Sequence, residues 1–374
     1  MKIVSILGTR PEIIKMSRVM AVLDRYTEHT IVHTGQNYDF ELNQLFFDEL
    51  EVRKPDHFLQ AAGKTAAETI GMVIAKSDSL FAEIRPDAVL ILGDTNSSLA
   101  ALPAKRRRIP VFHMEAGNRC FDDRSPEEIN RRIVDHISDI NMPYSSISRE
   151  YLLREGIAPD RIIKTGSPMY EVLHYYLPKI RESSILERFA LEPGKFFVVS
   201  CHREENVDQP RELERFAALL NSLAAEHKLP LIVSTHPRTR KRLNELGVKL
   251  NPEVQLKEPV GLFDFVWMEM NARATLSDSG TITEESSILG FAALNLREMH
   301  ERPEGMEEAA VMMTGFELAR VRDGLRILAD QPEAQLRIVD EYNVPNVSQK
   351  VLRIIISYLN YVHRKVWHQC APEN

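Results

Sequence analysis

Hydroxyl and carboxylate side chains gather after a short apolar segment late in the chain. Ser279, Gly280 and Thr281 follow an expected strand and precede an expected helix, whose first turn holds Glu284 and Glu285. Glycine lets the backbone approach a ligand closely, and hydroxyls and first-turn amides donate to phosphate oxygens. Glu284 and Glu285 lie where a carboxylate can accept both hydroxyls of a ribose. The same residues also fit an ordinary helix start with acids in its first turn.

Three carboxylates in the first half of the chain have the chemistry for proton transfer. Asp94 follows an apolar strand, Glu115 ends another, and Glu127 lies in the first turn of an expected helix. Carboxylates that surround a bound anion repel one another, so we expect at least one to hold its proton at neutral pH. Such a set suits removal of a proton from carbon and its return on the other side. Asp94 also fits the cap of a helix that begins near Ser97.

The expected helix 126–137 decides which of two adjacent glutamates faces the site. Its periodicity places one stripe inward, with Glu127 at the start of that stripe. Glu128 and Arg132 then form an outward pair on the surface. The inward stripe comprises Glu127, Asn130, Arg131 and Val134.

Cations at other expected strand ends are candidates for binding a diphosphate. Arg10 can donate two bonds to it, and Lys15 supplies a point charge. His202 and Arg203 can stabilise charge on a departing diphosphate. His236 ends a further strand. Capping or surface roles for the basic residues, and structural hydrogen bonds for the histidines, remain open.

Two further candidates lie on either side of the hydroxyl-rich turn. Phe265, on an expected helix, can lay its ring against a pyrimidine base, although a core aromatic fits equally well. Arg302 lies in a charged segment after a buried strand, where Pro303 fixes a turn. Surface loops share this composition, but the position beyond a strand end favours a ligand contact.

Composition is that of a soluble globular protein with room for two domains. The 374 residues are 44% hydrophobic and 27% charged, with a net charge of -7. This acidic balance argues against nucleic acid or an anionic membrane as a partner. No apolar run approaches the ~18 residues of a membrane span, and no signal-peptide pattern occurs, so we expect a cytoplasmic protein. Three cysteines without CxxC spacing indicate neither disulfides nor a metal site.

Alternating strands and helices predict an α/β fold with parallel sheets covered on both faces. We expect one domain over residues 1–170 and a second over 171–346, with a helix at about 347–370 that packs back on the first. Ligands of such sheets bind beyond the carboxyl ends of the strands, where all the candidate residues lie. The expected strands are 2–7, 31–34, 88–92, 111–114, 196–200, 231–234, 274–276 and 293–296.

With these segments assembled, the chain resembles the non-hydrolysing UDP-N-acetylglucosamine 2-epimerase family over nearly its whole length. The motifs that carry the resemblance occur in the family's order. They are Gly8-Thr9-Arg10-Pro11-Glu12 with Lys15, Gly93-Asp94-Thr95, His113-Met114-Glu115-Ala116-Gly117, Pro126-Glu127-Glu128-Ile129-Asn130-Arg131, His202-Arg203-Glu204, Asp278-Ser279-Gly280 with Glu284-Glu285, and Glu301-Arg302-Pro303-Glu304.

The resemblance implies two doubly wound Rossmann-like domains of the glycosyltransferase-B type, with UDP held in an interdomain cleft. It implies no metal, no nicotinamide or other cofactor, a UDP-sugar substrate and, as is usual in the family, a homodimer. Family members remove the proton on sugar C2 and expel UDP by anti elimination. They then return UDP to the bound 2-acetamidoglycal and protonate C2 from the opposite face.

Roles follow from the resemblance for the residues that match its motifs. The acid and base candidates are Asp94, Glu115 and Glu127, without an assignment of acid or base. The diphosphate contacts are Arg10, Lys15 and His202. The phosphate, ribose and uracil contacts are Ser279, Gly280, Thr281, Glu285 and Phe265, and the further substrate contacts are Arg203, His236 and Arg302.

Departures from the common family pattern bear on the substrate. Asn118 stands where the family usually has Leu, and Cys201 stands where it has Gly. Gly280-Thr281-Ile282-Thr283 replaces Gly-Gly-Ile-Gln, and the spacing from Glu115 to Glu127 is shorter. These versions look like the branch that converts UDP-2-acetamido-2,6-dideoxy-L-talose to UDP-N-acetyl-L-fucosamine for capsule or O-antigen. UDP-N-acetylglucosamine itself is the alternative substrate.

Two other classes of protein remain open at this stage. A glycosyltransferase shares the fold but needs an acceptor groove and has no evident use for three carboxylates. A non-catalytic UDP-sugar sensor would keep residues 279–285 and tolerate loss of Asp94, Glu115 and Glu127, which are all present.

Overall fold

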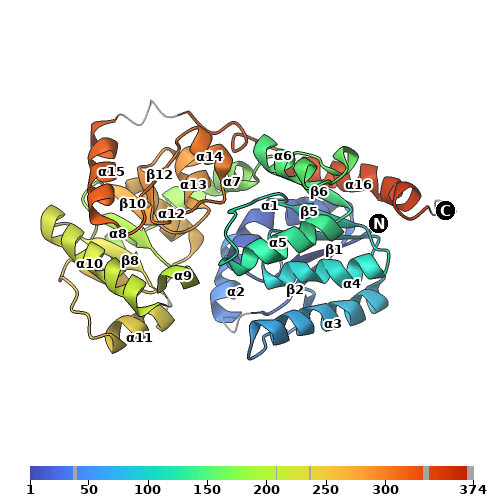
Figure 1. Cartoon of the computed structure of the whole chain (residues 1–374), viewed down its shortest axis with the longest axis horizontal. Helices are drawn as coiled ribbons and strands as arrows, with labels where there is room; N and C mark the ends of the chain where they lie inside the picture. The colour runs from blue at the N-terminus through green and yellow to red at the C-terminus, as the bar shows by residue number, and fades with distance from the viewer. Residues whose placement is uncertain (37–39, 208, 236, 332–336, 369–374) are drawn as a thin grey trace. The chain divides into compact units, whose positions relative to one another are not determined.

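The computed structural model describes residues 1–36, 40–207, 209–235, 237–331 and 337–368. The chain forms two compact units, one of residues 1–175 with 341–374 and one of residues 176–340. Helix α7 (Met169–Arg181) contains the boundary between them. Each unit holds one six-stranded sheet in which all the paired strands are parallel (Figure 1).

The sheet of the first unit has the strand order β3-β2-β1-β4-β5-β6. Its strands are β1 (Lys2–Leu7), β2 (Glu28–His33), β3 (His57–Phe58), β4 (Ala88–Leu92), β5 (Val111–Met114) and β6 (Ile140–Met142). The order reverses between β1 and β4, and ligands of doubly wound sheets bind at such a switch point. The loops that begin at Gly8 and Gly93 leave the sheet there.

The sheet of the second unit repeats this topology in the order β12-β11-β10-β7-β8-β9. Its strands are β7 (Phe197–Ser200), β8 (Leu231–Ser234), β9 (Val254–Lys257), β10 (Ala274–Ser277), β11 (Ala293–Asn295) and β12 (Met312–Met313). Here the switch point lies between β7 and β10. The loops that begin at Cys201 and Asp278 leave the sheet at this point, so the predicted phosphate-binding turn lies at a ligand position of the fold.

Helices connect the strands in both units and cover the sheets. The first unit contains α1 (Arg10–Tyr26), α2 (Phe40–Glu49), α3 (Ala66–Ile84), η1 (Asn96–Ala100), α4 (Ala101–Arg106), α5 (Pro126–Ile137), α6 (Ser146–Arg154), η2 (Pro159–Arg161) and α16 (Val347–Lys365). The second contains α8 (Ile185–Arg188), α9 (Glu204–Val207), α10 (Pro210–His227), α11 (Pro237–Glu245), α12 (Leu262–Asn271), α13 (Ile282–Leu289), α14 (Pro303–Glu307) and α15 (Leu318–Asp330). The predicted α/β fold class is confirmed.

Alternation along each strand divides its side chains between two buried layers. Val4 and Ile6 of β1 pack in one cluster with Val73 and Phe81 of α3. Ile3, their neighbour on the other face, is also fully buried. Both faces of a parallel sheet are covered by helices, so a strand such as β4 is apolar throughout, and its apolar run located it in the sequence. Strands β6 and β9, which include polar residues, were not predicted. Two-residue strands such as β3 and β12 carry no such signal and were missed.

The helix α16 belongs to the first unit although the second unit precedes it in the chain. It contacts α1, and its residues Val351 and Ile355 are fully buried. The amide and hydroxyl of Ser348, at its start, bond to the carboxylate of Glu171. Among the residues that the structure describes, no helix is both long and apolar enough to cross a membrane.

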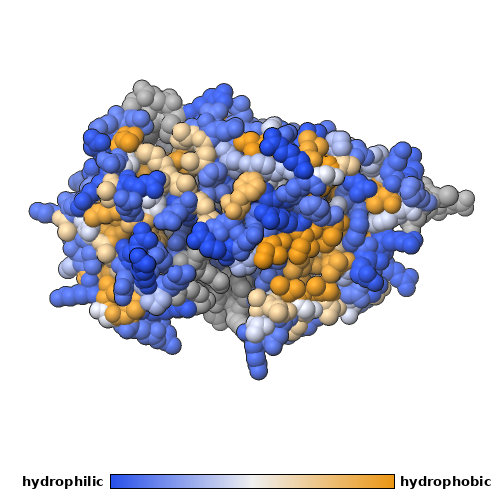
Figure 2. Space-filling model, in the orientation of Figure 1, coloured by the Kyte–Doolittle hydropathy of each residue, from blue (hydrophilic) through white to orange (hydrophobic). Residues whose placement is uncertain are grey.

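An apolar surface lies over two adjacent helices of the first unit. Leu102 of α4, and Ile129 and Ile133 of α5, are exposed by 37%, 54% and 43%. The two helices contact each other, and Figure 2 shows a hydrophobic area on this side of the unit. We call these three residues the α4–α5 patch.

The packing of α16 on α1 leads to a prediction about stability. Ile355→Ala should lower the free energy of unfolding by about 2–5 kcal/mol, because it leaves a cavity at a fully buried position. The adjacent Ile356 is 54% exposed, so Ile356→Ala should change it by less than about 0.5 kcal/mol. Urea denaturation of the two variants measures both values. Equal losses would show that α16 does not pack as described.

Candidate active site

Lys15 and Glu115, predicted separately, form a buried ion pair in the first unit. The Lys15 Nζ lies 2.6 Å from Glu115 Oε2, and Asn118 donates to Glu115 Oε1 over 3.2 Å. Glu115 itself has a φ of 63°, a left-handed conformation that side chains rarely adopt. The backbone of Glu115 is therefore strained at the end of β5, and its carboxylate is held between the ammonium group of Lys15 and the amide of Asn118.

Asp94 is held by α5 and does not cap the helix after it. Its Oδ2 accepts from Arg131 Nε over 2.9 Å and lies 2.7 Å from the second guanidinium nitrogen. Asn130 of the same helix donates to the Asp94 carbonyl. Thr95 is the cap of η1, since its hydroxyl accepts from the amide of Ser97. The capping alternative for Asp94 is therefore wrong.

The prediction that Glu128 faces outward is also wrong. Glu128 is fully buried and accepts bonds from the amide of Cys120 and from Arg131 and Arg132. Glu127 is partly exposed and accepts from the hydroxyl of Ser125 over 2.7 Å. The later part of the predicted stripe is buried as expected, but in the first turn the two cations and a loop amide draw Glu128 inward. The Glu128–Arg132 pair exists, with its acidic partner in the interior.

Glu12 is a buried carboxyl at this site to which the sequence analysis gave no role. It accepts bonds from the amides of Gly8 and Thr9 over 2.5 and 2.7 Å, and from the hydroxyl of Thr95 over 2.6 Å. Burial raises its pKa to about 7, against the lowering effect of these bonds. Glu12 thus ties the loop after β1 to the loop that carries Asp94. Its position at N3 of α1, three residues after Thr9, was the available signal.

Arg10 begins α1 on the same loop. Its guanidinium carbon lies 5.8 Å from the centre of the Phe46 ring, and the side chain is partly exposed. Gly8 precedes it at a point of close approach, where an added Cβ would lie 1.9 Å from the hydroxyl of Ser97. Only glycine fits there, because the loop packs directly against η1.

Asp278 organises the switch point of the second unit. It is fully buried and accepts from the amides of His202 and Arg203, from Asn206 and from the thiol of Cys201. Burial acts to raise its pKa, but the charge of His202 and these bonds hold it below the usual value. A carboxylate thus fixes the loop after β7 to the loop after β10. Asp278 belongs to one of the motifs that carry the family resemblance, but no role was predicted for it.

His202 lies on this carboxylate with much of its ring open to solvent. The Nδ1 is 3.3 Å from Asp278 Oδ1, and 55% of the side chain is exposed. Arg203 turns toward Glu301, with 3.3 Å between their closest charged atoms. In the loop after β7, His202 thus contacts Asp278 and Arg203 contacts Glu301.

The predicted phosphate turn is compact. The hydroxyls of Ser279 and Thr281 are 2.9 Å apart, and Thr281 caps α13 without a side-chain bond to its amides. A Cβ on Gly280 would lie 3.6 Å from Glu301 and 3.8 Å from Arg203. The turn therefore has hydroxyls, a helix N-terminus and a guanidinium close together, as an anion site requires.

Two glutamates at the start of α13 differ in their partners. Glu284 is fully buried and lies 3.3 Å from Arg302 Nε, so Arg302 is part of the interior and not of a surface loop. Glu285 is 7% exposed. Glu269 of α12 lies near Glu285, fully buried, and both its oxygens lack a hydrogen-bond partner among the described residues. Burial, and then the charge of Glu285, raise the pKa of Glu269 well above its usual value.

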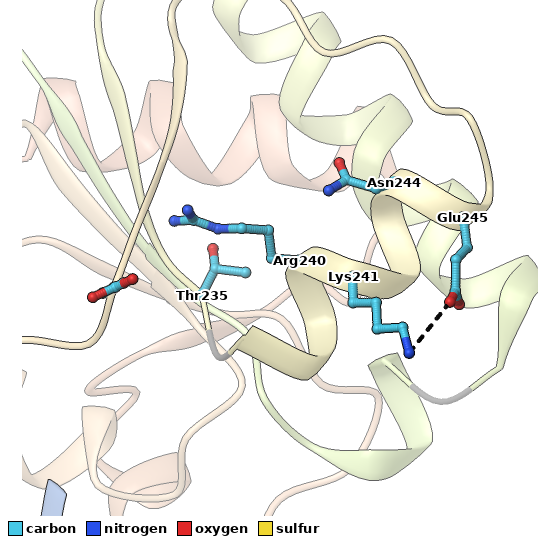
Figure 3. Close-up of a pocket in the computed structure, with 6 residues that line it drawn as sticks. Thr235, Arg240, Lys241, Asn244 and Glu245 are labelled. Carbon is cyan, nitrogen blue, oxygen red and sulfur yellow. Dashed lines mark ion pairs between the residues drawn. The ribbon is translucent and has the colours of Figure 1, made fainter. Parts of the chain in front are cut away.

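Phe265 and His236 remain without a demonstrated ligand role. Phe265 is partly buried and packs against a core cluster that includes Val198, Ile232 and Met268. His236 lies outside the described residues. A surface pocket of about 480 Å³ opens beside the preceding residue, Thr235, at the end of β8 (Figure 3). The other residues that line it are Arg240, Lys241, Asn244, Glu245 and Glu258.

A model of the family described as UDP-N-acetylglucosamine 2-epimerase matches residues 21–356. The chain belongs to this family. The resemblance read from its motifs is confirmed at that level, and enzymes of the family are isomerases.

Solved structures and curated relatives agree with this membership. The structure of UDP-N-acetylglucosamine 2-epimerase from Rickettsia bellii is 46% identical, with a TM-score of 0.92 over 99% of this chain and 100% of that one. The epimerase from Methanocaldococcus jannaschii in complex with UDP-GlcNAc and UDP is 32% identical, with a TM-score of 0.89 over 96% and 100% of the two chains. The UDP-2,3-diacetamido-2,3-dideoxy-D-glucuronate 2-epimerase of Pseudomonas aeruginosa is 34% identical over 84% of this chain and 88% of its own.

The environment of Glu269 predicts a pH-dependent change in stability. In the folded protein Glu269 keeps its proton above pH 4.5, where the unfolded chain has released it, so stability falls as pH rises. Glu269→Gln should therefore raise the free energy of unfolding at pH 8 and leave it nearly unchanged at pH 4. Urea denaturation at both pH values measures this. Glu245→Gln, on the surface of α11, is the control, and a destabilised Glu269→Gln at pH 8 would contradict the prediction.

Proposed function

We propose that this epimerase converts UDP-2-acetamido-2,6-dideoxy-L-talose to UDP-N-acetyl-L-fucosamine, a precursor for capsule or O-antigen. The observation that carries the proposal is the contact of Asn118 with Glu115. Where the common pattern has an aliphatic leucine, this chain has an amide that donates to Glu115 Oε1. The substitution places a polar group beside a predicted acid or base, and this difference at the site supports a sugar other than the common one.

The other departures also contact the predicted site. The thiol of Cys201 lies 3.2 Å from Asp278, the carboxylate that orders both loops of the second unit. The hydroxyl of Thr281 lies 2.9 Å from that of Ser279 in the phosphate turn. The Pseudomonas relative is named for a 2,3-diacetamido glucuronate, so relatives in this family differ in the sugar they act on. These contacts support a specialised member of the family.

The carboxylates of the first unit supply the proton chemistry in this proposal. One removes the proton from C2 while the bond from C1 to UDP breaks, which leaves a C1–C2 double bond in a 2-acetamidoglycal. UDP then adds back to C1 as another carboxylate protonates C2 on the opposite face. Asp94, Glu115 and Glu127 are the candidates. Lys15 and Arg131 balance the charges of Glu115 and Asp94.

The second unit supplies the nucleotide contacts. Ser279, Gly280 and Thr281 bind phosphate oxygens, and His202 stabilises the departing diphosphate. Glu285 accepts the ribose hydroxyls, and Phe265 lies against the uracil. Arg10, Arg203, His236 and Arg302 remain proposed substrate contacts. That one sugar nucleotide is held in a cleft by both units stays a prediction.

Epimerisation of UDP-N-acetylglucosamine is the second candidate. It is favoured by the Methanocaldococcus relative, whose structure contains UDP-GlcNAc and UDP. Both candidates share the scheme above and differ only in the sugar.

We also propose a homodimer. The α4–α5 patch supports it, because adjacent exposed apolar side chains on two packed helices are typical of a surface that another chain covers.

Incubation with each UDP sugar in deuterium oxide tests the proposed function. Deuterium should appear at C2 of both epimers, with kcat/KM about 10- to 100-fold higher for the 6-deoxy talose than for UDP-N-acetylglucosamine. The reverse preference would establish the second candidate. Free UDP with a new glycoside would indicate a transferase, and binding without exchange would indicate a sensor.

Glu115→Gln should abolish deuterium exchange at C2 and change the Kd for UDP by no more than a few fold. The amide keeps the shape of the side chain and cannot take a proton from carbon. Glu150→Gln, on the exposed face of α6, serves as the control and should exchange normally. Unchanged exchange in Glu115→Gln would remove Glu115 from the mechanism.

A further inference from the structure

The inner face of α5 binds the two loops that carry Asp94 and Glu115. Arg131 holds the Asp94 carboxylate. One turn later, Asp135 accepts from the amide of Gly117, at 3.2 Å from each of its oxygens. Gly117 follows Glu115 by two residues, so a single helix contacts both loops at their functional ends.

His113 extends the contact of Asp135 back to the loop of Asp94. Its Nε2 donates to the carbonyl of Gly93 over 2.8 Å, and its Nδ1 lies 3.0 Å from Asp135 Oδ1. Burial acts to lower the pKa of His113, but Asp135 and the Gly93 carbonyl raise it above 6.5. The ring therefore lies between the Gly93 carbonyl, to which Nε2 donates, and the Asp135 carboxylate close to Nδ1, and it connects the residue before Asp94 to α5.

Asp135 is buried deeply and carries a balanced set of charges. It is 1% exposed, and Arg119, itself 2% exposed, donates to its Oδ2 over 2.8 Å. Arg119 also pairs with Glu155, directly after the end of α6. Burial acts to raise the pKa of Asp135, and His113 and Arg119 hold it below its usual value. A paired, ionised aspartate in the interior is a rigid point of attachment.

Glycine is required where Asp135 meets the loop of Glu115. Gly117 has a φ of 79°, and a Cβ there would lie 2.5 Å from the carbonyl oxygen of Ser148. The backbone is thus pressed between α6 and Asp135, directly after the left-handed Glu115. The loop has no room to shift independently of the carboxylate that accepts its amide.

We propose that Asp135 is a positioning residue that sets the separation of Asp94 and Glu115 during proton transfer at C2. It acts through His113 and Gly117 and does not contact the substrate. The inference rests on the proposed function, in which carboxylates work on opposite faces of one carbon. Displacement of a reacting group by about 1 Å can cost about 100-fold in rate, so a buried attachment that fixes two such groups controls both transfers.

Asp135→Asn tests the proposal in the full-length protein. The amide keeps its size and can still accept from Gly117, but it loses the ion pairs with His113 and Arg119. We expect kcat to fall about 10- to 100-fold, with KM within about threefold. In deuterium oxide the ratio of epimerised to deuterated but unepimerised sugar should fall at least severalfold, because loss of relative placement impairs the second transfer more than the first.

Asp139→Asn is the matched control. Asp139 is also fully buried and also pairs with a cation, Lys105, but it accepts from the amide of Val111 at the opposite end of β5. It should cost stability comparably and leave the product ratio unchanged. The same drop in ratio in both variants would mean that general loosening is responsible, and would overturn the proposal.

Two further outcomes distinguish failure of this inference from failure of the proposed function. A folded Asp135→Asn variant with wild-type kcat and product ratio would overturn the inference while the proposed function stands. No exchange at C2 in the wild-type protein would remove the proposed function, and this inference with it. If Asp135→Asn does not fold, His113→Gln provides the test, since its amide still donates to Gly93 without the charge. The same fall in product ratio supports the proposal, and a wild-type ratio overturns it.

Discussion

Two buried aspartates, Asp135 and Asp278, accept backbone amides from the loops at which substrate chemistry is proposed. Each lies where a parallel sheet ends, and each is charged at a cost that nearby cations offset. A hydrogen bond from a backbone amide to a carboxylate fixes both the distance between the two groups and the direction of the N–H bond. These bonds therefore fix the backbone beside Glu115 and beside the phosphate turn.

The α/β fold was predictable from the sequence because long apolar runs mark several strands and regular hydrophobic periodicity marks the helices. Strands β4, β5 and β8 and helix α5 have the limits that their apolar runs indicated, and the loops after them hold most of the candidate residues. The doubly wound order then brings those loops to one edge of each sheet. Short elements such as β12 were missed because two residues form no periodic pattern.

Side-chain partners were less predictable because they depend on tertiary contacts. Helical spacing placed Glu127 inward and Glu128 outward, but the amide of Cys120 and two arginines bind Glu128 in the interior. Glu12 appeared only within a motif, and its burial against Thr95 depends on a neighbouring strand end. Glu269 stood in an apolar helix with no sign that its neighbour in space would be another carboxylate. Spacing along the chain indicates which face of a helix or strand a residue occupies. It does not indicate which groups from other elements contact the residue on that face.

The placement of α16 has a consequence for how the protein is made. The first unit is built from two separated stretches of chain, and the surface of α1 that α16 covers must wait for the last part of the chain to emerge. At roughly 5–20 residues per second, translation of the intervening residues 176–340 takes on the order of ten seconds or more. During this interval the surface of α1 that α16 later covers stays exposed, so the first unit completes its packing only after the second unit has been made.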